Sequence, residues 1–369
     1  MNVHLVGPIG LTDPARPSGG NVYDIRLASA LRSRGHDVLL HETTTGGLSS
    51  VLAGLPDGAV AVVDGLVCSA APDALADERD RVALVALVHL PIGLAVAGST
   101  PRRAPEARAL TAVHAVVCTS RWTRDWLATA YDLPAARLHV VVPGADKSPL
   151  AEGSPAGDRL LSVGAITPVK GHDVLVSALA LVADLRWTWS LVGASVDAAH
   201  ATGLWSALCN AGIDARVTLA GALTGHDLAA AYAGADLLVL PSRHETYGIV
   251  ASEALARGIP VLATDVGGVR EALGASSRGA TPGLLVPSSD PVALAASLRD
   301  WLTTDSLRAR LRSLAAERRA ALDGWDVAAA AVEKVLTDVT RSPAGHERGA
   351  PPAPTRAGPR TNPGSSSSS

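Results

Sequence analysis

The sequence predicts an α/β protein with two parallel β-sheets, each covered by helices on both faces. Short apolar runs rich in Val, Leu and Ala alternate with helix-length amphipathic segments. The runs are apolar throughout rather than at every second residue, which is typical of strands buried on both faces. This alternation starts twice along the 369 residues, and the chain is longer than a single core usually organises.

The first half of the chain carries six expected strands. They are the apolar runs at residues 2–6, 37–41, 59–64, 82–89, 115–119 and 138–142. Helices are expected between them at residues 22–34 and 120–131, and Ser120 is placed to cap the second helix with its hydroxyl. Residues 143–158 then interrupt the pattern with Pro and Gly, which predicts an interdomain linker.

The same pattern restarts after the linker. Strands are expected at residues 159–164, 186–192, 216–220, 237–240, 260–263 and 283–286. Helices are expected between them at residues 172–182, 196–211, 225–234, 248–256 and 291–303. Two more helices, at residues 305–322 and 325–340, close the folded part. Residues 341–369 are rich in Pro, Gly and Ser, which predicts a disordered tail.

Composition and charge exclude several classes of protein. A formal net charge of −3 disfavours a general nucleic-acid binder, which usually carries a basic face. Three widely spaced cysteines form neither a metal-binding pattern nor a disulfide framework. The N-terminus lacks a signal-peptide pattern, and the longest apolar run, residues 82–98, is too short to span a bilayer. We therefore expect a cytoplasmic protein, and peripheral contact with the inner face of the membrane stays open.

Two loops are candidates for binding an anion, because sheets of this kind bind ligands where their strands end. Gly19 and Gly20 lie just before a helix, where backbone N–H groups can approach an anion without a Cβ in the way, although a plain flexible turn fits them equally. Lys170 follows the strand at residues 159–164 and lies beside the next helix start, a position that favours phosphate. A solvated loop lysine is the alternative reading, but lysine is rare in this chain.

Two glutamates flank the start of the helix expected at residues 248–256. Glu245 lies in the loop before this helix and Glu253 in its second turn. A carboxylate suits a vicinal diol, since each of its oxygens can accept one hydroxyl. Two ordinary glutamates, favoured near a helix start by the helix dipole, fit the same spacing.

These residues also belong to longer patterns. Glu245 and Glu253 lie in the pattern Pro-Ser-x-x-Glu-x-Tyr-Gly-Ile-Val at residues 241–250 and its continuation. This pattern resembles the E-x7-E signature of the retaining nucleotide-sugar glycosyltransferases of family 4, which have the GT-B fold. The Ser-Gly-Gly loop at residues 18–20, the Val-Gly to Lys-Gly segment at residues 163–171 and the Gly-Gly-x-x-Glu turn at residues 267–271 resemble the same family. Together these matches span roughly residues 1–340.

The resemblance implies a GT-B architecture of two facing Rossmann-like domains with an interdomain cleft. Residues 1–147 would form an acceptor-binding domain and residues 158–323 a nucleotide-sugar donor domain. Residues 324–340 would form a helix that crosses back to the N-terminal domain, and residues 341–369 the tail. Such an enzyme moves a hexosyl group from a UDP- or GDP-sugar to an acceptor with retention of configuration. It needs no metal and no cofactor, the nucleotide sugar being a co-substrate.

The resemblance also implies roles for the matching residues. Glu253 would accept hydrogen bonds from the ribose diol, Glu245 would bind hydroxyls of the donor sugar, and Lys170 would neutralise the diphosphate. His89, at the end of an N-terminal strand, would face the sugar from across the cleft, although a core histidine fits that position too. The expected catalytic residues are thus His89, Lys170 and Glu245. The expected donor-binding residues are Gly19, Gly20, Lys170, Glu245, Tyr247, Gly248, Ile249, Val250 and Glu253.

One departure from the family pattern affects the diphosphate. Ala165 stands where many relatives carry Arg, and Val169 replaces a commonly acidic residue, so one of two usual cationic contacts is missing. Either Arg243 or His172 replaces it, or the donor binds more weakly.

The acceptor and two alternative functions stay open. Arg102, Arg103, Arg108, Arg121 and Arg124 give the N-terminal domain positive charge that suits an anionic acceptor or lipid headgroups, but a solvated surface explains them as well. The acceptor is therefore a small molecule, a glycan or a lipid. A non-catalytic or regulatory GT-B sugar-nucleotide-binding protein and a GT-B sugar-nucleotide epimerase are the alternatives. A Rossmann dehydrogenase is excluded, because neither half carries the required glycine fingerprint with its acidic partner.

Overall fold

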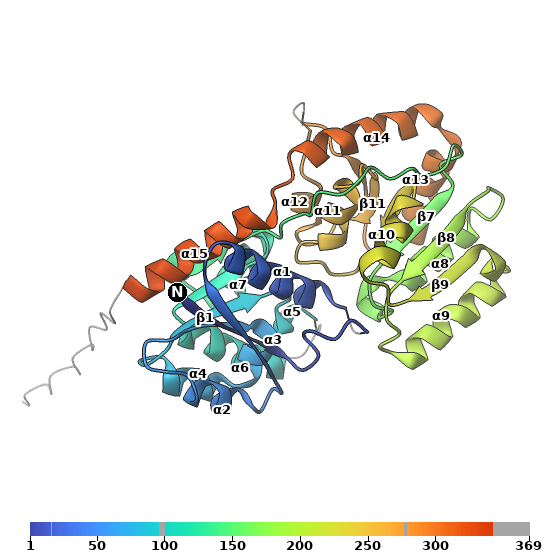
Figure 1. The fold of residues 1–369 in the computed structure, drawn as a ribbon. Helices are drawn as coiled ribbons and strands as arrows, with labels where there is room; N and C mark the ends of the chain where they lie inside the picture. The colour runs from blue at the N-terminus through green and yellow to red at the C-terminus, as the bar shows by residue number, and fades with distance from the viewer. Residues whose placement is uncertain (16, 96–99, 277–278, 342–369) are drawn as a thin grey trace, which may run out of the picture.

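The computed structural model describes residues 1–15, 17–95, 100–276 and 279–341 (Figure 1). It contains two sheets of six strands, and every strand pair in both sheets is parallel. The predicted α/β architecture with two parallel sheets is therefore confirmed.

The first sheet has the strand order β2-β1-β3-β4-β5-β6. Its strands are β1 (Asn2–Pro8), β2 (Asp37–Thr43), β3 (Val60–Asp64), β4 (Ala83–Val88), β5 (Ala115–Cys118) and β6 (Leu138–Val140). Its helices are α1 (Gly19–Ser33), α2 (Leu48–Ala53), α3 (Gly65–Ala70), α4 (Pro72–Glu78), α5 (Ile92–Ala95), α6 (Thr100–Ala112) and α7 (Arg121–Tyr131), with a 3-10 turn at Ala135–Arg137. Ser120 caps α7 as predicted, since its Oγ accepts a hydrogen bond from the Thr123 amide at 3.0 Å.

The second sheet has the order β12-β11-β10-β7-β8-β9. Its strands are β7 (Arg159–Val163), β8 (Thr188–Val192), β9 (Val217–Gly221), β10 (Leu237–Leu240), β11 (Val261–Thr264) and β12 (Gly283–Val286). Its helices are α8 (His172–Ala180), α9 (Ala198–Asn210), α10 (Gly225–Ala233), α11 (Ile249–Leu255), α12 (Val269–Leu273), α13 (Pro291–Thr303) and α14 (Asp305–Ala320), with 3-10 turns at Pro168–Lys170 and Asp214–Arg216. The last helix is α15 (Trp325–Arg341).

Strand burial follows the position of each strand in its sheet. All residues of β3, β5, β10 and β11 are buried, as the continuous apolar runs predict. The expectation of full burial is wrong for β9, which has no buried residue, and for much of β2. Both strands lie at the edge of a sheet, where only one side has a neighbouring strand.

Each sheet reverses its strand order once, and this reversal positions the candidate site. The reversal points lie between β1 and β3 in the first sheet and between β7 and β10 in the second. Ligands of such sheets bind outside the carboxyl ends of the strands at these points. The loops that carry Gly19 and Gly20, Lys170, and Glu245 follow β1, β7 and β10 respectively.

The last helix packs against the first domain. Figure 1 shows α15 in red, beyond α14 and beside α1. Val332 and Leu336 of α15 are buried in the same apolar cluster as Leu27 and Leu31 of α1. Of the predicted tail, Arg341 ends α15, and residues 342–369 lie outside the described residues.

The segment between the sheets, residues 143–158, contains no helix or strand. In the part of the chain that the structure describes, none of the helices combines the length and apolar character needed to cross a bilayer.

Candidate functional site

A cavity of about 450 Å³ lies between the two halves of the molecule. Every residue expected to bind the donor lines it, from Gly19, Gly20 and His89 on one side to Lys170, residues 245 and 247–250 and Glu253 on the other. Sequence positions more than two hundred residues apart therefore meet in one place. Most of the remaining lining is apolar, so polar contacts to a ligand are concentrated in a few groups.

Lys170 and Glu245 form an ion pair in this cavity. Lys170 Nζ lies 2.5 Å from Glu245 Oε1, and the Ser242 hydroxyl donates to the same oxygen at 2.8 Å. Glu245 is 8% exposed and the Lys170 side chain is 29% exposed. Two residues with separate expected roles, at the diphosphate and at the sugar, thus form an ion pair with each other.

The loop between β10 and α11 brings Glu245 and the start of α11 to the cavity. Gly248 has φ of +91°, a conformation that L side chains rarely adopt, and the next residue begins α11. Glu253 follows in the second turn, where its Oε2 accepts a hydrogen bond from the Tyr232 hydroxyl at 2.7 Å. Burial raises the pKa of Glu253, and the Tyr232 hydrogen bond and the charge of Arg257 oppose that rise.

The Gly19–Gly20 loop closes the cavity from the first domain. A Cβ on Gly20 would lie 3.0 Å from His89 Cδ2, so glycine allows this close approach. A Cβ on Gly19 would lie 3.5 Å from Ile249 Cγ2 at the start of α11. The loop therefore packs between His89 of its own domain and α11 of the other.

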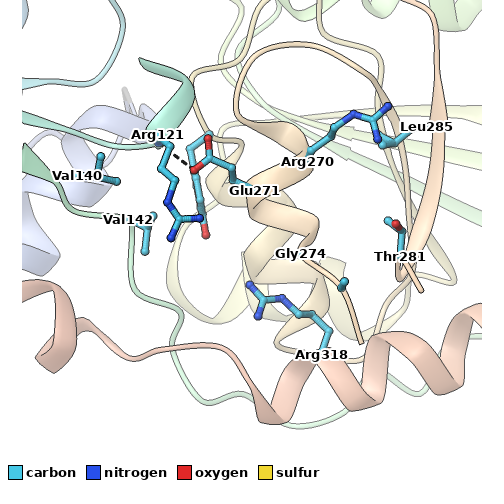
Figure 2. Close-up of a pocket in the computed structure, with 11 residues that line it drawn as sticks. Arg121, Val140, Val142, Arg270, Glu271, Gly274, Thr281, Leu285 and Arg318 are labelled. Carbon is cyan, nitrogen blue, oxygen red and sulfur yellow. Dashed lines mark hydrogen bonds between the residues drawn. The ribbon is translucent and has the colours of Figure 1, made fainter. Parts of the chain in front are cut away.

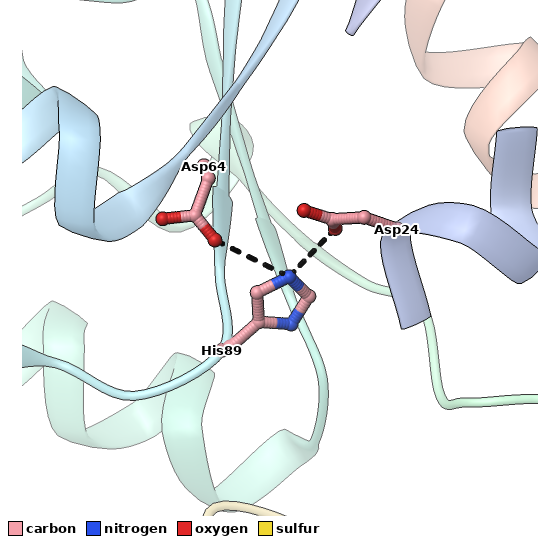
Figure 3. A group of neighbouring side chains, drawn as sticks. All are labelled: Asp24, Asp64 and His89. Atoms are coloured by element: carbon pink, nitrogen blue, oxygen red, sulfur yellow. Dashed lines mark hydrogen bonds and ion pairs between the residues drawn. The ribbon is translucent and has the colours of Figure 1, made fainter. Parts of the chain in front are cut away.

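His89 is held by two aspartates that no sequence motif indicated (Figure 3). Its Nε2 lies 2.7 Å from Asp24 Oδ1 and 3.7 Å from Asp64 Oδ2. Burial disfavours the charged imidazole, but the charge and hydrogen bond of Asp24 and the charge of Asp64 outweigh it and raise the pKa of His89. Burial also raises the pKa of Asp64, to about 6.

A signal for both aspartates existed in the sequence. Asp24 is fully buried on a face of α1 that otherwise buries Tyr23, Leu27 and Leu31. Asp64 ends the apolar strand β3, and β4, the next strand of the sheet, leads directly to His89. The sequence alone shows Asp24 on an apolar helix face and Asp64 at the end of an apolar strand. It does not show that the two carboxylates lie together at His89, because that depends on the order of the strands in the sheet.

The two domains contact each other through two segments that match the family patterns, the loop before α11 and the Gly-Gly-x-x-Glu turn at residues 267–271. The Thr246 hydroxyl donates to the backbone carbonyl of His89. Glu271, from the Gly-Gly-x-x-Glu turn, accepts hydrogen bonds from the Arg121 and Trp122 amides at 2.9 and 2.8 Å. Glu271 therefore satisfies free N–H groups at the start of α7 in the other domain.

Neither residue expected to replace the missing arginine lines the cavity. Arg243 forms a two-pronged pair with Asp173 at 2.9 and 2.6 Å. His172 is 2% exposed, and burial together with the charge of Lys170 lowers its pKa to about 3, so it is neutral at pH 7. Among the residues that the structure describes, Lys170 is the one lysine or arginine that lines the cavity.

A larger hollow of about 690 Å³ shares Tyr247 with the cavity but contains none of the other expected site residues. Figure 2 shows Arg121, Arg270 and Arg318 around it, with Glu271 beside Arg121. Arg270 pairs with Asp265, and Arg121 and Arg270 are both exposed.

Three of the arginines considered for the acceptor have partners within the protein. Arg108 pairs with Asp73, Arg124 pairs with Asp125, and Arg103 lies over the Trp126 ring at 5.9 Å. The Arg102 side chain lies outside the described residues.

Comparison with known proteins identifies the family. Residues 64–148 match the family described as Glycosyltransferase Family 4, and residues 152–318 match Glycosyl transferases group 1. A D-inositol 3-phosphate glycosyltransferase of Xylanimonas cellulosilytica is 34% identical over 294 residues, which cover 72% of this chain and 69% of the relative. The enzyme of the same name from Kineococcus radiotolerans is 32% identical over 271 residues, covering 67% of this chain and 62% of that relative.

Solved structures share the fold at lower identity. Sucrose-phosphate synthase from Thermosynechococcus elongatus superposes with a TM-score of 0.77 at 21% identity, covering 92% of this chain and 99% of that one. The Anabaena protein HepE in complex with UDP-glucose superposes with a TM-score of 0.73 at 17% identity, covering 92% and 100%. The chain belongs to the GT-B glycosyltransferases of the group 1 and family 4 type.

Proposed function

We propose that this protein transfers a hexosyl group from a UDP- or GDP-sugar to a hydroxyl of an unidentified acceptor, with retention of configuration and without a metal ion. The observation that carries the proposal is the cavity in which Lys170, Glu245 and Glu253 of one domain face Gly19, Gly20 and His89 of the other. HepE, which has the same fold, is described in complex with UDP and with UDP-glucose, which supports a nucleotide-sugar donor.

The proposed mechanism begins with an exchange of partners at the ion pair. A diphosphate is a stronger and more highly charged acceptor than Glu245, so Lys170 Nζ turns to the donor phosphates. Glu245 is then free to accept hydrogen bonds from sugar hydroxyls, and Glu253 from the ribose diol. Breaking the sugar–phosphate bond places negative charge on the leaving diphosphate, where Lys170 and the backbone N–H groups of residues 247–250 stabilise it.

Retention follows in this proposal from attack on the face from which the diphosphate departs. Closure of the cleft excludes water and limits hydrolysis of the donor. In this proposal the acceptor is a small molecule, a glycan or a lipid. We propose the cytoplasm as the place of reaction, with peripheral contact at the inner face of the membrane if the acceptor is a lipid.

The test is a thermal-shift panel with UDP-, GDP- and ADP-sugars. A ligand at one hundred times its dissociation constant stabilises the folded state by about 2.7 kcal/mol, which raises the melting temperature by a few degrees. We expect a response to the UDP or GDP series. A response to none of the three series contradicts the transferase proposal.

A further inference from the structure

The buried carboxylates of Asp24 and Asp64 lie next to His89, which lines the cavity (Figure 3). Asp24 is 0% exposed and lies on α1, and Asp64 is 5% exposed and follows β3. Each of the three offers one ligand or hydrogen-bonding atom within 4.8 Å of the others. Two acidic side chains thus surround one nitrogen of one imidazole.

The contacts fix the orientation of the His89 ring. Nε2 is engaged by Asp24 at 2.7 Å, and the Tyr23 ring packs on His89 with 5.1 Å between ring centroids. Gly20 lies against the Cδ2 edge of the ring. Figure 3 shows the other ring nitrogen, Nδ1, on the side turned away from both carboxylates, and His89 is part of the cavity lining.

The surrounding charges decide the protonation of this ring. The Asp64 carboxylate accepts a hydrogen bond from the Leu66 amide at 2.7 Å, whereas Asp24 Oδ2 has no partner among the described residues. Two buried carboxylates without a cation are costly, and a protonated His89 supplies that cation. From the other domain, Lys170 and Glu245 line the same cavity as an ion pair, so their charges largely cancel.

We propose that Asp24 is a positioning residue for sugar transfer. Together with Asp64, it holds His89 as an imidazolium that donates its Nδ1–H to an oxygen of the bound donor. This inference rests on the proposed function for the identity of the donor. It adds that donor binding by His89 depends on the charge of Asp24, a residue that does not line the cavity.

The first test is an NMR titration of His89 in the ligand-free protein, with its signals assigned through His89→Gln. The wild-type imidazole should titrate above the ordinary value of 6.5, because Asp24 and Asp64 favour the cation over the opposing effect of burial. Asp24→Asn keeps the shape and removes the charge, so the His89 midpoint should fall below that of the wild type.

Asp37→Asn is the matched control. It makes the same substitution at an exposed residue of the same domain, whose charge acts on His4. The His89 midpoint should be unchanged in this variant.

The second test is the pH dependence of donor turnover. Since the proposal requires the protonated ring, kcat/KM should fall as the pH rises through the His89 midpoint. In Asp24→Asn the fall in kcat/KM should begin at lower pH. At pH 8 the kcat/KM of this variant should be at least about tenfold below that of the wild type, as expected for the loss of a charge-assisted hydrogen bond. A structural role alone would lower stability without moving the pH profile.

Three results would overturn the proposal. One is a His89 midpoint that does not respond to Asp24→Asn, and another is a wild-type profile in which activity falls towards acidic pH instead. The third is stoichiometric binding of Zn²⁺ or Mn²⁺ that shifts the His89 signals and is lost in Asp24→Asn, which would make the cluster a metal site. If no nucleotide sugar binds, the proposed function fails, while the NMR titration still decides the state of His89.

Discussion

At the scale of single residues, the ionisable side chains of the site have hydrogen-bond or ion-pair partners within the protein. Lys170 forms an ion pair with Glu245. Glu253 accepts a hydrogen bond from the Tyr232 hydroxyl, and the His89 ring bonds to the Asp24 carboxylate. A polar group in a largely apolar cavity needs such a partner. In the proposed function, donor binding is an exchange of hydrogen-bond and ion-pair partners. Removing Glu245 should therefore strengthen nucleotide binding, and removing Lys170 should weaken it.

Glu245→Gln tests this exchange. Without the carboxylate, Lys170 no longer gives up an ion pair when it meets a phosphate, so UDP should bind about two- to fivefold more tightly, in line with a partly exposed pair worth up to about 1 kcal/mol. Turnover of the sugar nucleotide should fall at the same time, because the sugar loses its acceptor. Calorimetric titration with UDP measures the first effect, and weaker UDP binding would show that Glu245 does not compete for Lys170.

At the scale of elements, the helix and strand pattern was predictable because local periodicity determines it. The predicted and observed bounds of α13, at residues 291–303, agree, and α7 begins directly after the predicted cap Ser120. The start of α1 at Gly19 rather than at residue 22 reflects the Ser18 cap, whose Oγ accepts from the Asn21 amide. The exposed edge strand β9 was not predictable, because edge position depends on the order of strands and not on their composition.

Glu271 should stabilise α7 from the other domain. Glu271→Ala leaves the Arg121 and Trp122 amides without their acceptor and should cost about 0.5–2 kcal/mol, the usual range for losing a helix cap. Hydrogen exchange should accelerate at these two amides. Arg270→Ala, an exposed neighbour on the same helix, is the control and should leave their exchange unchanged.

The helix α15 should be required for the stability of the first domain. Leu336 is fully buried against this domain, so Leu336→Ala should lower the free energy of unfolding by about 2–5 kcal/mol. Val327 on the same helix is 48% exposed, and Val327→Ala should change it by less than about 0.5 kcal/mol. Equal effects in urea unfolding would contradict the packing of α15 described above.

At the scale of the whole molecule, the relative placement of the domains makes the site, and this part was least accessible from the sequence. The site residues that the resemblance implied, at positions 19, 20, 89, 170, 245, 247–250 and 253, all line one cavity. The resemblance did not indicate that Lys170 pairs with Glu245, that Thr246 binds the His89 carbonyl, or that Arg243 is taken by Asp173. Such pairings join side chains that are far apart in the sequence, so a local sequence pattern cannot predict them.

The molecule should also lose stability in mild acid through His172. This buried histidine has its pKa lowered to about 3, and its Nδ1 has no partner in the described part of the chain. Below pH 6.5 the unfolded state binds a proton that the folded state does not, so stability falls as the pH falls, by about 2–3 kcal/mol at pH 4.5. His172→Gln should remove this part of the pH dependence in denaturant unfolding, whereas His226→Gln, at a 96% exposed side chain, should retain it. Parallel pH profiles for wild type and His172→Gln would contradict this assignment.

The proposed function depends on Lys170 binding the diphosphate of a nucleotide sugar in the cavity between the domains. The most direct measurement is the dissociation constant for UDP-glucose, or for the sugar nucleotide selected by the thermal-shift panel, in the wild type, Lys170→Ala and Lys147→Ala. Lys147 is exposed and outside the cavity, so it controls for the loss of one lysine. We predict that Lys170→Ala weakens binding by about 10- to 100-fold, as expected for a hydrogen bond between charged groups, and that Lys147→Ala has no effect. An unchanged dissociation constant in a folded Lys170→Ala protein would contradict this role of Lys170.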